Sequence, residues 1–226
     1  MKTAYKPVPF TGLPAYSDAE MHARARAFRE RMATRRTIRH FSDRPVPRAV
    51  IEQAVLTAGT APSGANKQPW HFAVVSDPAL KQRIRAAAET AERNFYAGKA
   101  GQQWLADVQP LGTDPDKPFL ETAPYLIIVF QQSYGIDPGT GERVKHYYIQ
   151  ESVGLASGLL IAALHDAGLA TLTHTPSPMG FLRDIVGRPR HEKPVMIVVT
   201  GHPAQDATVP EAALRKKPVA EVMSWH

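Results

Sequence analysis

The sequence predicts a domain of mixed α and β structure, with helices packed around one sheet. The chain has 226 residues, with 43% hydrophobic and 21% charged side chains, which is typical of a globular protein with a sizeable core. Helix-like and strand-like segments also alternate along the chain. Finally, APYLIIVF at residues 123–130 is a continuous apolar run, as in a strand buried on both faces.

The first third of the chain predicts an arm, two helices and a strand. Residues 1–16 contain three prolines and no periodicity, which indicates an extended arm. Ser17 or Asp18 can cap a helix that runs to about Thr34. A second helix begins near Pro47, at its first position, and Gly59 suits the C′ position that ends it. Residues 70–75, WHFAVV, predict a short strand.

The remainder predicts two further helices and three strands. A helix begins at residues 77–78 and runs to 98, whereas residues 98–118 show no strong period and predict a mobile connection. Residues 146–169 predict a long helix that is apolar nearly all round, central to a core or to a dimer interface. Gly154 and Gly158, four residues apart, would let another helix approach it closely. The apolar run at 123–130 and two segments within 169–176 and 194–203 predict strands, and a polar tail follows.

The charge is concentrated near the N-terminus. The net charge is +6, and residues 1–48 alone hold eleven Lys or Arg and four acids, a surplus of +7. Such a segment can contact the phosphate of a nucleic acid or of a cofactor. A solvated helix face is the alternative for most of these arginines.

Several classes of chemistry are excluded or disfavoured. The absence of cysteine excludes disulfides, iron–sulfur clusters and a thiol nucleophile. No GxxxxGK[ST], GxGxxG or HExxH motif is present, and the histidines lack ligand spacing, so we expect no metal. The N-terminus has no apolar signal region and no apolar run is long enough for a bilayer. We therefore expect a cytoplasmic protein without a membrane partner.

Two segments could hold a flat, anionic cofactor. Arg35, Arg36 and Arg39 in RRTIRHF supply forked donors that suit phosphate and carbonyl oxygens. The alternative is a basic helix end. Residues 62–65, PSGA, offer backbone N–H groups without side-chain cover, or are an ordinary loop.

These segments resemble the FMN-dependent nitroreductase family. The resemblance rests on R-R-x-x-R at residues 35–39 and P-S-x-x-x-x-Q-P-W at residues 62–70, two segments that embrace the flavin in that family. Within the family, roughly residues 30–222 are similar to the iodotyrosine deiodinase branch. The resemblance implies an α+β fold with a central, mainly antiparallel sheet flanked by helices. It also implies an intertwined homodimer, in which an arm of residues 1–16 and an extension of residues 203–226 flank one FMN-binding domain and the extension embraces the partner.

The resemblance also assigns the cofactor site, which both subunits would build. The residues implied to bind FMN are Arg35, Arg36, Thr37, Ile38 and Arg39, then Pro62, Ser63 and Gly64 from the partner subunit, and Thr173, His174 and Thr175 beside the flavin ring. Either Arg215 or Lys216 would meet the phosphate. Thr175 matches the residue whose hydroxyl faces flavin N5, which would favour single-electron steps. NAD(P)H or another reductant would be the electron donor.

Glu92, Tyr96 and Lys117 match the residues that bind the zwitterion of a halogenated tyrosine in this branch. The first two are four residues apart, so a helix places both on one face. A carboxylate suits the substrate ammonium and a lysine suits its carboxylate. The backbone N–H of Ala65 would meet the substrate phenolate. The implied reaction is reductive dehalogenation of halotyrosine.

Two other functions stay open at this stage. A general NAD(P)H-dependent nitroreductase would keep FMN, and Glu92, Tyr96 and Lys117, here called the lid residues, would have no role in substrate binding. His174 departs from the small residue expected at its position, which leaves room for a different substrate. A nucleic-acid-binding module would use the basic first quarter, although no aromatic platform accompanies its arginines.

Overall fold

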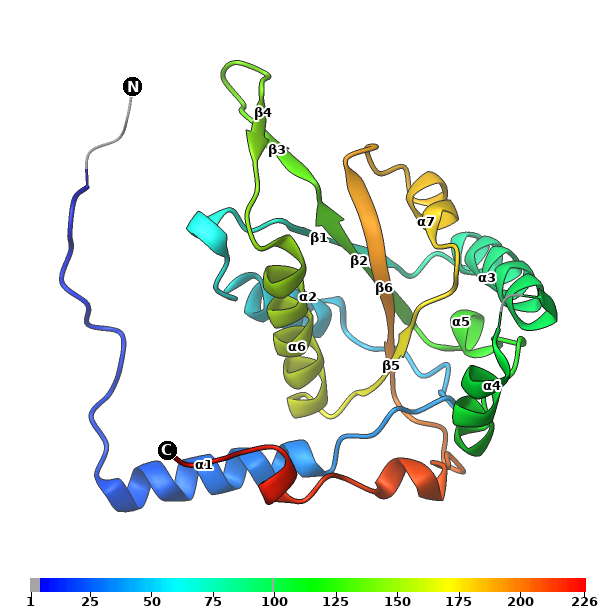
Figure 1. Cartoon of the computed structure of the whole chain (residues 1–226), viewed down its shortest axis with the longest axis horizontal. Helices are drawn as coiled ribbons and strands as arrows, with labels where there is room; N and C mark the ends of the chain where they lie inside the picture. The colour runs from blue at the N-terminus through cyan, green and yellow to red at the C-terminus, as the bar shows by residue number, and fades with distance from the viewer. Residues whose placement is uncertain (1–4, 99) are drawn as a thin grey trace. The chain divides into compact units, whose positions relative to one another are not determined.

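A computed structural model describes residues 5–98 and 100–226, which fall into a unit ending at Thr34 and a second unit of residues 35–226 (Figure 1). In the first unit, an extended segment leads into helix α1, Asp18–Ala33. Ser17 caps this helix through a capping box: the Glu20 N–H donates to Ser17 Oγ and the Ser17 N–H donates to the Glu20 carboxylate. The predicted first helix is confirmed.

The second unit is built on one four-stranded antiparallel sheet. Its strands are β1 (Trp70–Val75), β2 (Tyr125–Gln132), β5 (Ala170–His174) and β6 (Glu192–Gly201), in the order β1-β2-β6-β5. Every neighbouring pair is antiparallel. Ile128 of β2 lies between Ala73 and Ile197 of the flanking strands. The four predicted strands and the antiparallel sheet are confirmed.

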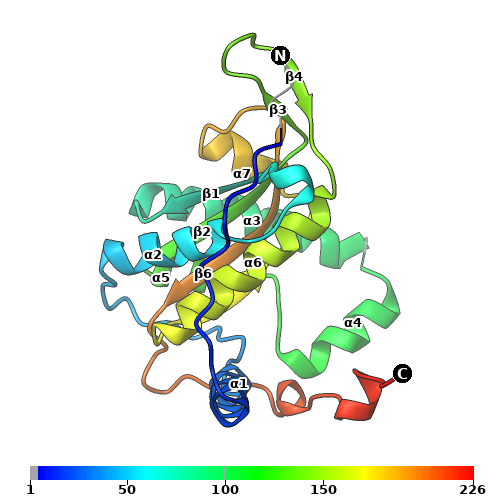
Figure 2. The ribbon, with the colours of Figure 1, turned by 90° about the vertical axis from the view of Figure 1, so that its left-hand side faces the viewer.

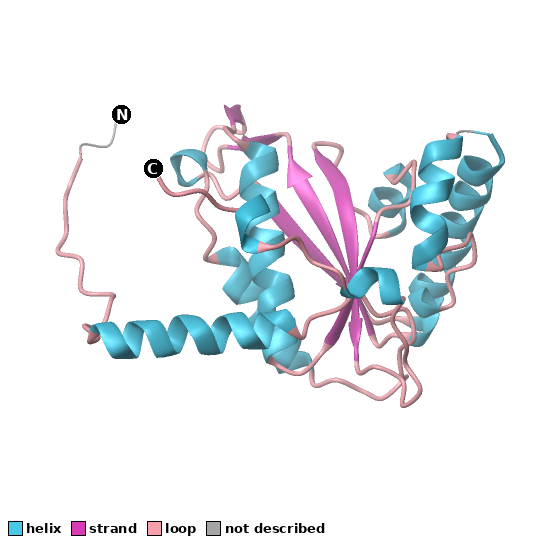
Figure 3. Cartoon of the chain, turned by 60° about the horizontal axis from the view of Figure 1, so that its bottom comes forward, coloured by secondary structure: helices cyan, strands magenta, loops and turns pink. Residues whose placement is uncertain are grey.

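Helices cover both faces of this sheet (Figure 3). Because side chains alternate along a strand, Leu126, Ile128 and Phe130 of β2 enter one apolar cluster, whereas Ile127 and Val129 enter the other. The first cluster is closed by α3 (Pro78–Gly98), α5 (Phe119–Thr122) and α7 (Gly180–Ile185). The second is closed by α2 (Arg48–Gly59) and α6 (Ile149–Asp166), which lie in front of the strands in Figure 2.

Three details differ from the sequence predictions. Pro47 is the N-cap of α2 and not its first residue, and Gly59 is the last helical residue, with Thr60 as C-cap. The connection expected at residues 98–118 contains regular structure that the sequence did not predict, namely α4 (Gln102–Val108) and the short 3₁₀ turn η2 (Gln109–Leu111). Trp104 of α4 packs edge-to-face on Phe95 and Tyr96, with ring centroids 5.0 and 5.2 Å apart. A helix this short is held by such contacts rather than by periodicity.

Smaller elements complete the chain. The strands β3 (Tyr134–Ile136) and β4 (Arg143–Lys145) form a hairpin whose turn is capped by the Asp137 carboxylate. The tail carries two 3₁₀ turns, η3 (Glu211–Leu214) and η4 (Val219–Glu221). No helix within the described residues is both long and apolar enough to cross a bilayer.

Candidate active site

The RRTIR segment lies against the edge of β5. The Ile38 N–H donates to the Thr171 carbonyl at 3.2 Å, and Thr37 forms a parallel bridge with Thr171. Because the two segments run parallel, Arg39 and the end of β5 at 173–175 lie at the same end of this pair. Two of the segments predicted to bind the cofactor are therefore neighbours, although more than a hundred residues separate them.

Arg39 links these segments to the lid residues on α3. It is half-buried, and burial lowers the pKa of its guanidinium while the nearby Tyr96 and Asp114 act in the opposite direction. Its positive charge also acts on Lys117. The candidate cofactor site and the candidate substrate site therefore form one electrostatic cluster.

Glu92 and Lys117 form a buried ion pair in this cluster. The Lys117 side chain is only 4% exposed, and its Nζ lies 3.7 Å from Glu92 Oε2. Burial raises the pKa of Glu92 and lowers the pKa of Lys117, and in each case the charge of the partner opposes the shift. The Lys117 ammonium also donates to the Asp114 carbonyl, and the Tyr96 hydroxyl donates to the Thr113 carbonyl at 3.4 Å. The structure thus brings Glu92, Tyr96 and Lys117 together within one chain.

His174 lies at the inner edge of the cluster. It is 7% exposed, and its ring packs edge-to-face on Phe119 with centroids 5.8 Å apart. Burial, aided by the charge of Lys117, lowers the pKa of His174 to about 3. Within residues 5–98 and 100–226, its buried Nε2 has no hydrogen-bond partner. The cluster therefore contains a neutral imidazole with an unsatisfied nitrogen.

Because the pKa of His174 is lowered, we expect the protein to lose stability in acid. The pKa of His174 is far lower in the folded chain than the ordinary 6.5 of the unfolded chain. Below pH 6.5 the unfolded chain therefore gains a proton that the folded chain does not, and the free energy of unfolding falls as the pH drops toward 3. We expect the free energy of unfolding of the wild type to fall about 2 kcal/mol more than that of His174→Gln between pH 6.5 and 4.5. Urea unfolding over this range measures the difference, with exposed His22→Gln as control. Parallel curves for wild type and His174→Gln would contradict it.

The small side chains of the PSGA loop have a structural reason within this chain. A side chain on Gly64 would place its Cβ 2.7 Å from the Tyr147 carbonyl oxygen, so the segment before α6 requires glycine there. Ala65 follows in the left-handed region at φ 50°, inside the 3₁₀ turn η1 (Gly64–Asn66). Ser63 Oγ accepts a hydrogen bond from the Gln68 N–H at 2.9 Å and holds the turn. The glycine thus serves packing within the chain, whereas Ala65 is exposed.

One chain does not bring this loop to the lid residues. The loop follows α2, which covers one face of the sheet, whereas α3 covers the other (Figure 1). Thr173 and Thr175 are exposed. Arg215 and Lys216 are exposed and lie in the extended segment that follows η3. The turn η3 itself contacts η2. Which of these two would meet a phosphate stays a prediction.

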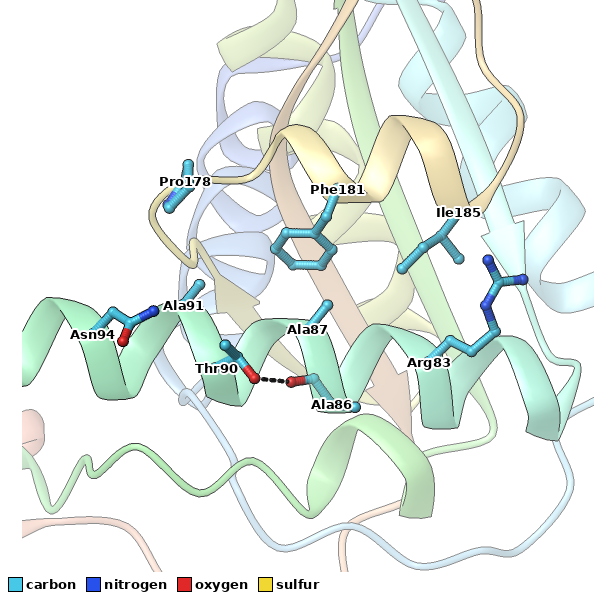
Figure 4. Close-up of a pocket in the computed structure, with 9 residues that line it drawn as sticks. All are labelled: Arg83, Ala86, Ala87, Thr90, Ala91, Asn94, Pro178, Phe181 and Ile185. Carbon is cyan, nitrogen blue, oxygen red and sulfur yellow. Dashed lines mark hydrogen bonds between the residues drawn. The ribbon is translucent and has the colours of Figure 1, made fainter.

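A shallow apolar groove lies on the opposite side of α3 from Glu92 and Tyr96. Ala87 of α3 faces Phe181 and Ile185 of α7 across it, as Figure 4 shows. The groove contains none of the residues singled out from the sequence. Within the described ranges, no group of three His, Asp or Glu side chains could hold a metal ion.

The sequence interpretation missed Arg85, Glu89 and Arg93. The Glu89 carboxylate accepts a hydrogen bond from the backbone N–H of Lys117 at 2.9 Å and pairs with both arginines. The pattern R-x-x-x-E-x-x-x-R along the predicted helix was the available signal, because side chains four residues apart meet on a helix.

Comparison with known proteins identifies the family. The family model described as Nitroreductase family matches residues 32–202. The iodotyrosine deiodinase of Haliscomenobacter hydrossis is 51% identical over 216 residues, which cover 96% of each chain. Human iodotyrosine deiodinase 1 is 43% identical over 209 residues, which cover 92% of this chain and 71% of the human protein.

Solved structures give the same result. A crystal structure of oxidized iodotyrosine deiodinase bound to FMN and 3-iodo-L-tyrosine has a TM-score of 0.69 at 32% identity, covering 79% of this chain and 90% of that one. A putative nitroreductase from Bacteroides thetaiotaomicron, at 20% identity and a TM-score of 0.60 over 88% of this chain and 96% of its own, shares the fold. The chain therefore belongs to the nitroreductase family. Within that family it is similar to the iodotyrosine deiodinases over nearly its whole length.

Proposed function

We propose that the protein is an FMN-dependent enzyme that reductively dehalogenates halotyrosine. The observation that carries the proposal is the buried Glu92–Lys117 ion pair, 3.7 Å across, in one cluster with Arg39 and His174. An amino acid zwitterion carries the complementary charges. Its ammonium replaces Lys117 as partner of Glu92, and its carboxylate replaces Glu92 as partner of Lys117.

The residues of the site fit FMN. Arg35, Arg36 and Arg39 provide planar forks for the phosphate and the carbonyl edge of the ring. The buried Nε2 of His174 calls for a polar partner that the described residues do not supply. When bound, FMN would supply the redox chemistry, and NAD(P)H or another reductant would supply the electrons. Thr173 and Thr175 would line the flavin, with the Thr175 hydroxyl directed at N5.

The chain's own groups would bind, orient and shield the substrate. Lys117 is buried and Glu92 and Tyr96 are partly buried, so contacts with the zwitterion form in a site with little water, where charge interactions are stronger. Tyr96 adds a hydroxyl beside the pair. The backbone N–H of Ala65, an exposed residue, would donate to the substrate phenolate, and the halogen acidifies the substrate phenol.

A homodimer would complete the site. The loop with Ala65 and Pro62 lies across the sheet from the lid, so a second copy must supply it. On α6, a side chain at Gly154 or Gly158 would meet nothing within 4 Å, and the neighbouring Leu155 is 52% exposed. This open apolar face of α6 would allow the close helix contact that the glycine spacing predicts. The cytoplasmic location expected from the sequence stays a prediction.

Titration of the FMN-loaded protein with 3-iodo-L-tyrosine, followed by flavin fluorescence, tests the function. We expect quenching by iodotyrosine at concentrations about 100-fold below those needed for 2-iodophenol, which lacks the zwitterion. Anaerobic turnover with reduced flavin should then release iodide. Quenching by nitrobenzene alone, with nitroaromatic reduction, would indicate a general nitroreductase instead. A colourless protein with salt-dependent DNA or RNA binding would point to a nucleic-acid-binding module.

A further inference from the structure

One face of α3 contacts residues 116–123 through charged side chains spaced every four residues. At the start of the helix, Lys81 Nζ donates to the carbonyls of Glu121 and Ala123 at 2.8 and 2.9 Å. One turn later, Arg85 Nη1 reaches the Glu121 carboxylate at 3.3 Å. Two turns further, Arg93 Nη1 reaches Asp116 at 3.4 Å. The helix therefore holds the segment that carries Lys117 along its length.

Glu89 occupies the centre of this row and contacts Lys117 itself. Its Oε1 accepts the Lys117 backbone N–H at 2.9 Å and Arg85 Nε at 2.7 Å, and its Oε2 lies 3.6 Å from Arg93. Glu89 is only 9% exposed. Burial raises the pKa of Glu89, but the hydrogen bonds from Arg85 and Lys117 and the two positive charges lower it below its usual value, so the carboxylate stays ionised.

The two ends of Lys117 are thus held by two carboxylates one turn apart on α3. Glu89 fixes the backbone at the nitrogen, and Glu92 faces the ammonium at the tip of a flexible four-carbon stem. A shift of the Lys117 backbone therefore displaces the ammonium at the end of the side chain. Binding sites need their contacting groups held within about 0.5 Å by a supporting shell of hydrogen bonds.

We propose that Glu89, held between Arg85 and Arg93, is a positioning residue that sets the place of Lys117 for a ligand carrying both an ammonium and a carboxylate. The inference rests on the proposed function, because it assumes a zwitterionic ligand. It goes beyond it by adding a residue that touches neither ligand nor cofactor. Removing Glu89 should lower affinity for the zwitterion while sparing ligands without it.

The chain contains a matched control for the loss of a helical ion pair. Arg48 and Glu52 on α2 form the same i, i+4 contact as Arg85 and Glu89, with Nε 2.7 Å from Oε1 in both. The Arg48–Glu52 pair is exposed and contacts no lid residue. Glu52→Ala therefore removes an equivalent pair without touching Lys117.

Calorimetric titration of the FMN-loaded protein provides the test. We expect Glu89→Ala to weaken binding of 3-iodo-L-tyrosine about tenfold to a hundredfold, with 2-iodophenol binding changed less than about twofold. Glu89→Gln keeps an acceptor for the Lys117 N–H but loses the charge, so it should weaken iodotyrosine binding about threefold to tenfold. In a Lys117→Met background, Glu89→Ala should have almost no further effect, because the positioned group is gone. Glu52→Ala should bind like the wild type.

Hydrogen exchange of residues 113–122 without substrate gives a readout independent of the dehalogenase function. We expect the Lys117 amide to exchange at least about tenfold faster in Glu89→Ala, to accelerate less in Glu89→Gln, which keeps an acceptor, and to be unchanged in Glu52→Ala. If Glu89→Ala does not fold, the double-mutant cycle of Glu89→Gln with Lys117→Met tests the positioning role instead. Equal loss for iodotyrosine and 2-iodophenol, or an additive effect in the Lys117→Met background, would overturn the positioning role. If the wild-type protein does not bind iodotyrosine, both the proposed function and the role of Glu89 in zwitterion binding are overturned. Hydrogen exchange would still show whether Glu89 fixes the backbone of Lys117.

Discussion

Replacing Lys117 by Met is expected to weaken binding of 3-iodo-L-tyrosine at least about 100-fold while FMN stays bound. Methionine keeps the length and the apolar stem but removes the only ammonium facing Glu92 in the described part of the lid. The substrate carboxylate then loses its partner ammonium, and it enters a partly buried site beside an unpaired Glu92. Fluorescence titration of the FMN-loaded variant measures the loss. Lys193→Met, on an exposed position of β6, is the control.

A change of ligand identifies the contact that is lost. 3-Iodotyramine lacks the carboxylate but keeps the ammonium and the iodophenol. We expect Lys117→Met to bind iodotyramine within about threefold of the wild type, because Glu92 remains as partner of the ammonium. Equal losses for both ligands would show that Lys117 supports the fold of the lid rather than the substrate carboxylate. Unchanged iodotyrosine binding would contradict its place in the site.

Replacing Arg188 by Met should destabilise the protein by about 3 to 5 kcal/mol at neutral pH. Arg188 holds Glu192, which is 1% exposed at the start of β6, through two hydrogen bonds of 2.7 and 2.8 Å. Without Arg188, the Gln132 side-chain amide, at 3.1 Å, remains as a hydrogen-bond donor to that carboxylate. Denaturant unfolding measures the loss, with Arg183→Met, which breaks a pair with exposed Asp184, as control.

The loss should depend on pH in a defined direction. In the wild type, burial raises the pKa of Glu192, but hydrogen bonds from Arg188 and Gln132 lower it below the usual value, so its contribution is present above about pH 4.5 and is lost in acid. Without Arg188, burial dominates and the folded pKa rises above the unfolded one. That reverses the sign, so the penalty of Arg188→Met should grow as the pH rises through 4.5 and beyond.

A double variant separates charge from packing. Arg188→Met with Glu192→Met replaces the pair by apolar side chains, and we expect it to recover most of the lost stability. A double variant as unstable as Arg188→Met would show that the arginine acts through packing of its stem. A penalty independent of pH would lead to the same conclusion.

The lid shows where sequence reasoning stopped. Glu92 and Tyr96 could be placed on one helix face from their spacing alone. Lys117 lies in a segment with no period, and only its match to the family singled it out. Glu89 carried the signal of its spacing from Arg85 and Arg93, but spacing could not show that its carboxylate meets a backbone N–H 28 residues away.

The sequence by itself determined the four strands of the main sheet, the main helices, the basic RRTIR segment, the glycine-containing PSGA segment and the family. It did not predict the β3–β4 hairpin. The apolar run of β2 favours a strand covered on both faces over a buried helix, because the run is short and rich in β-branched and aromatic residues. The tertiary structure alone decided which residues meet: RRTIR beside β5, Lys117 against Glu92 and Glu89, and Gly64 beneath Tyr147. The reason is that hydrophobic patterning fixes which face of an element is buried, whereas ion pairs and close backbone contacts between distant segments depend on how the covered faces are docked.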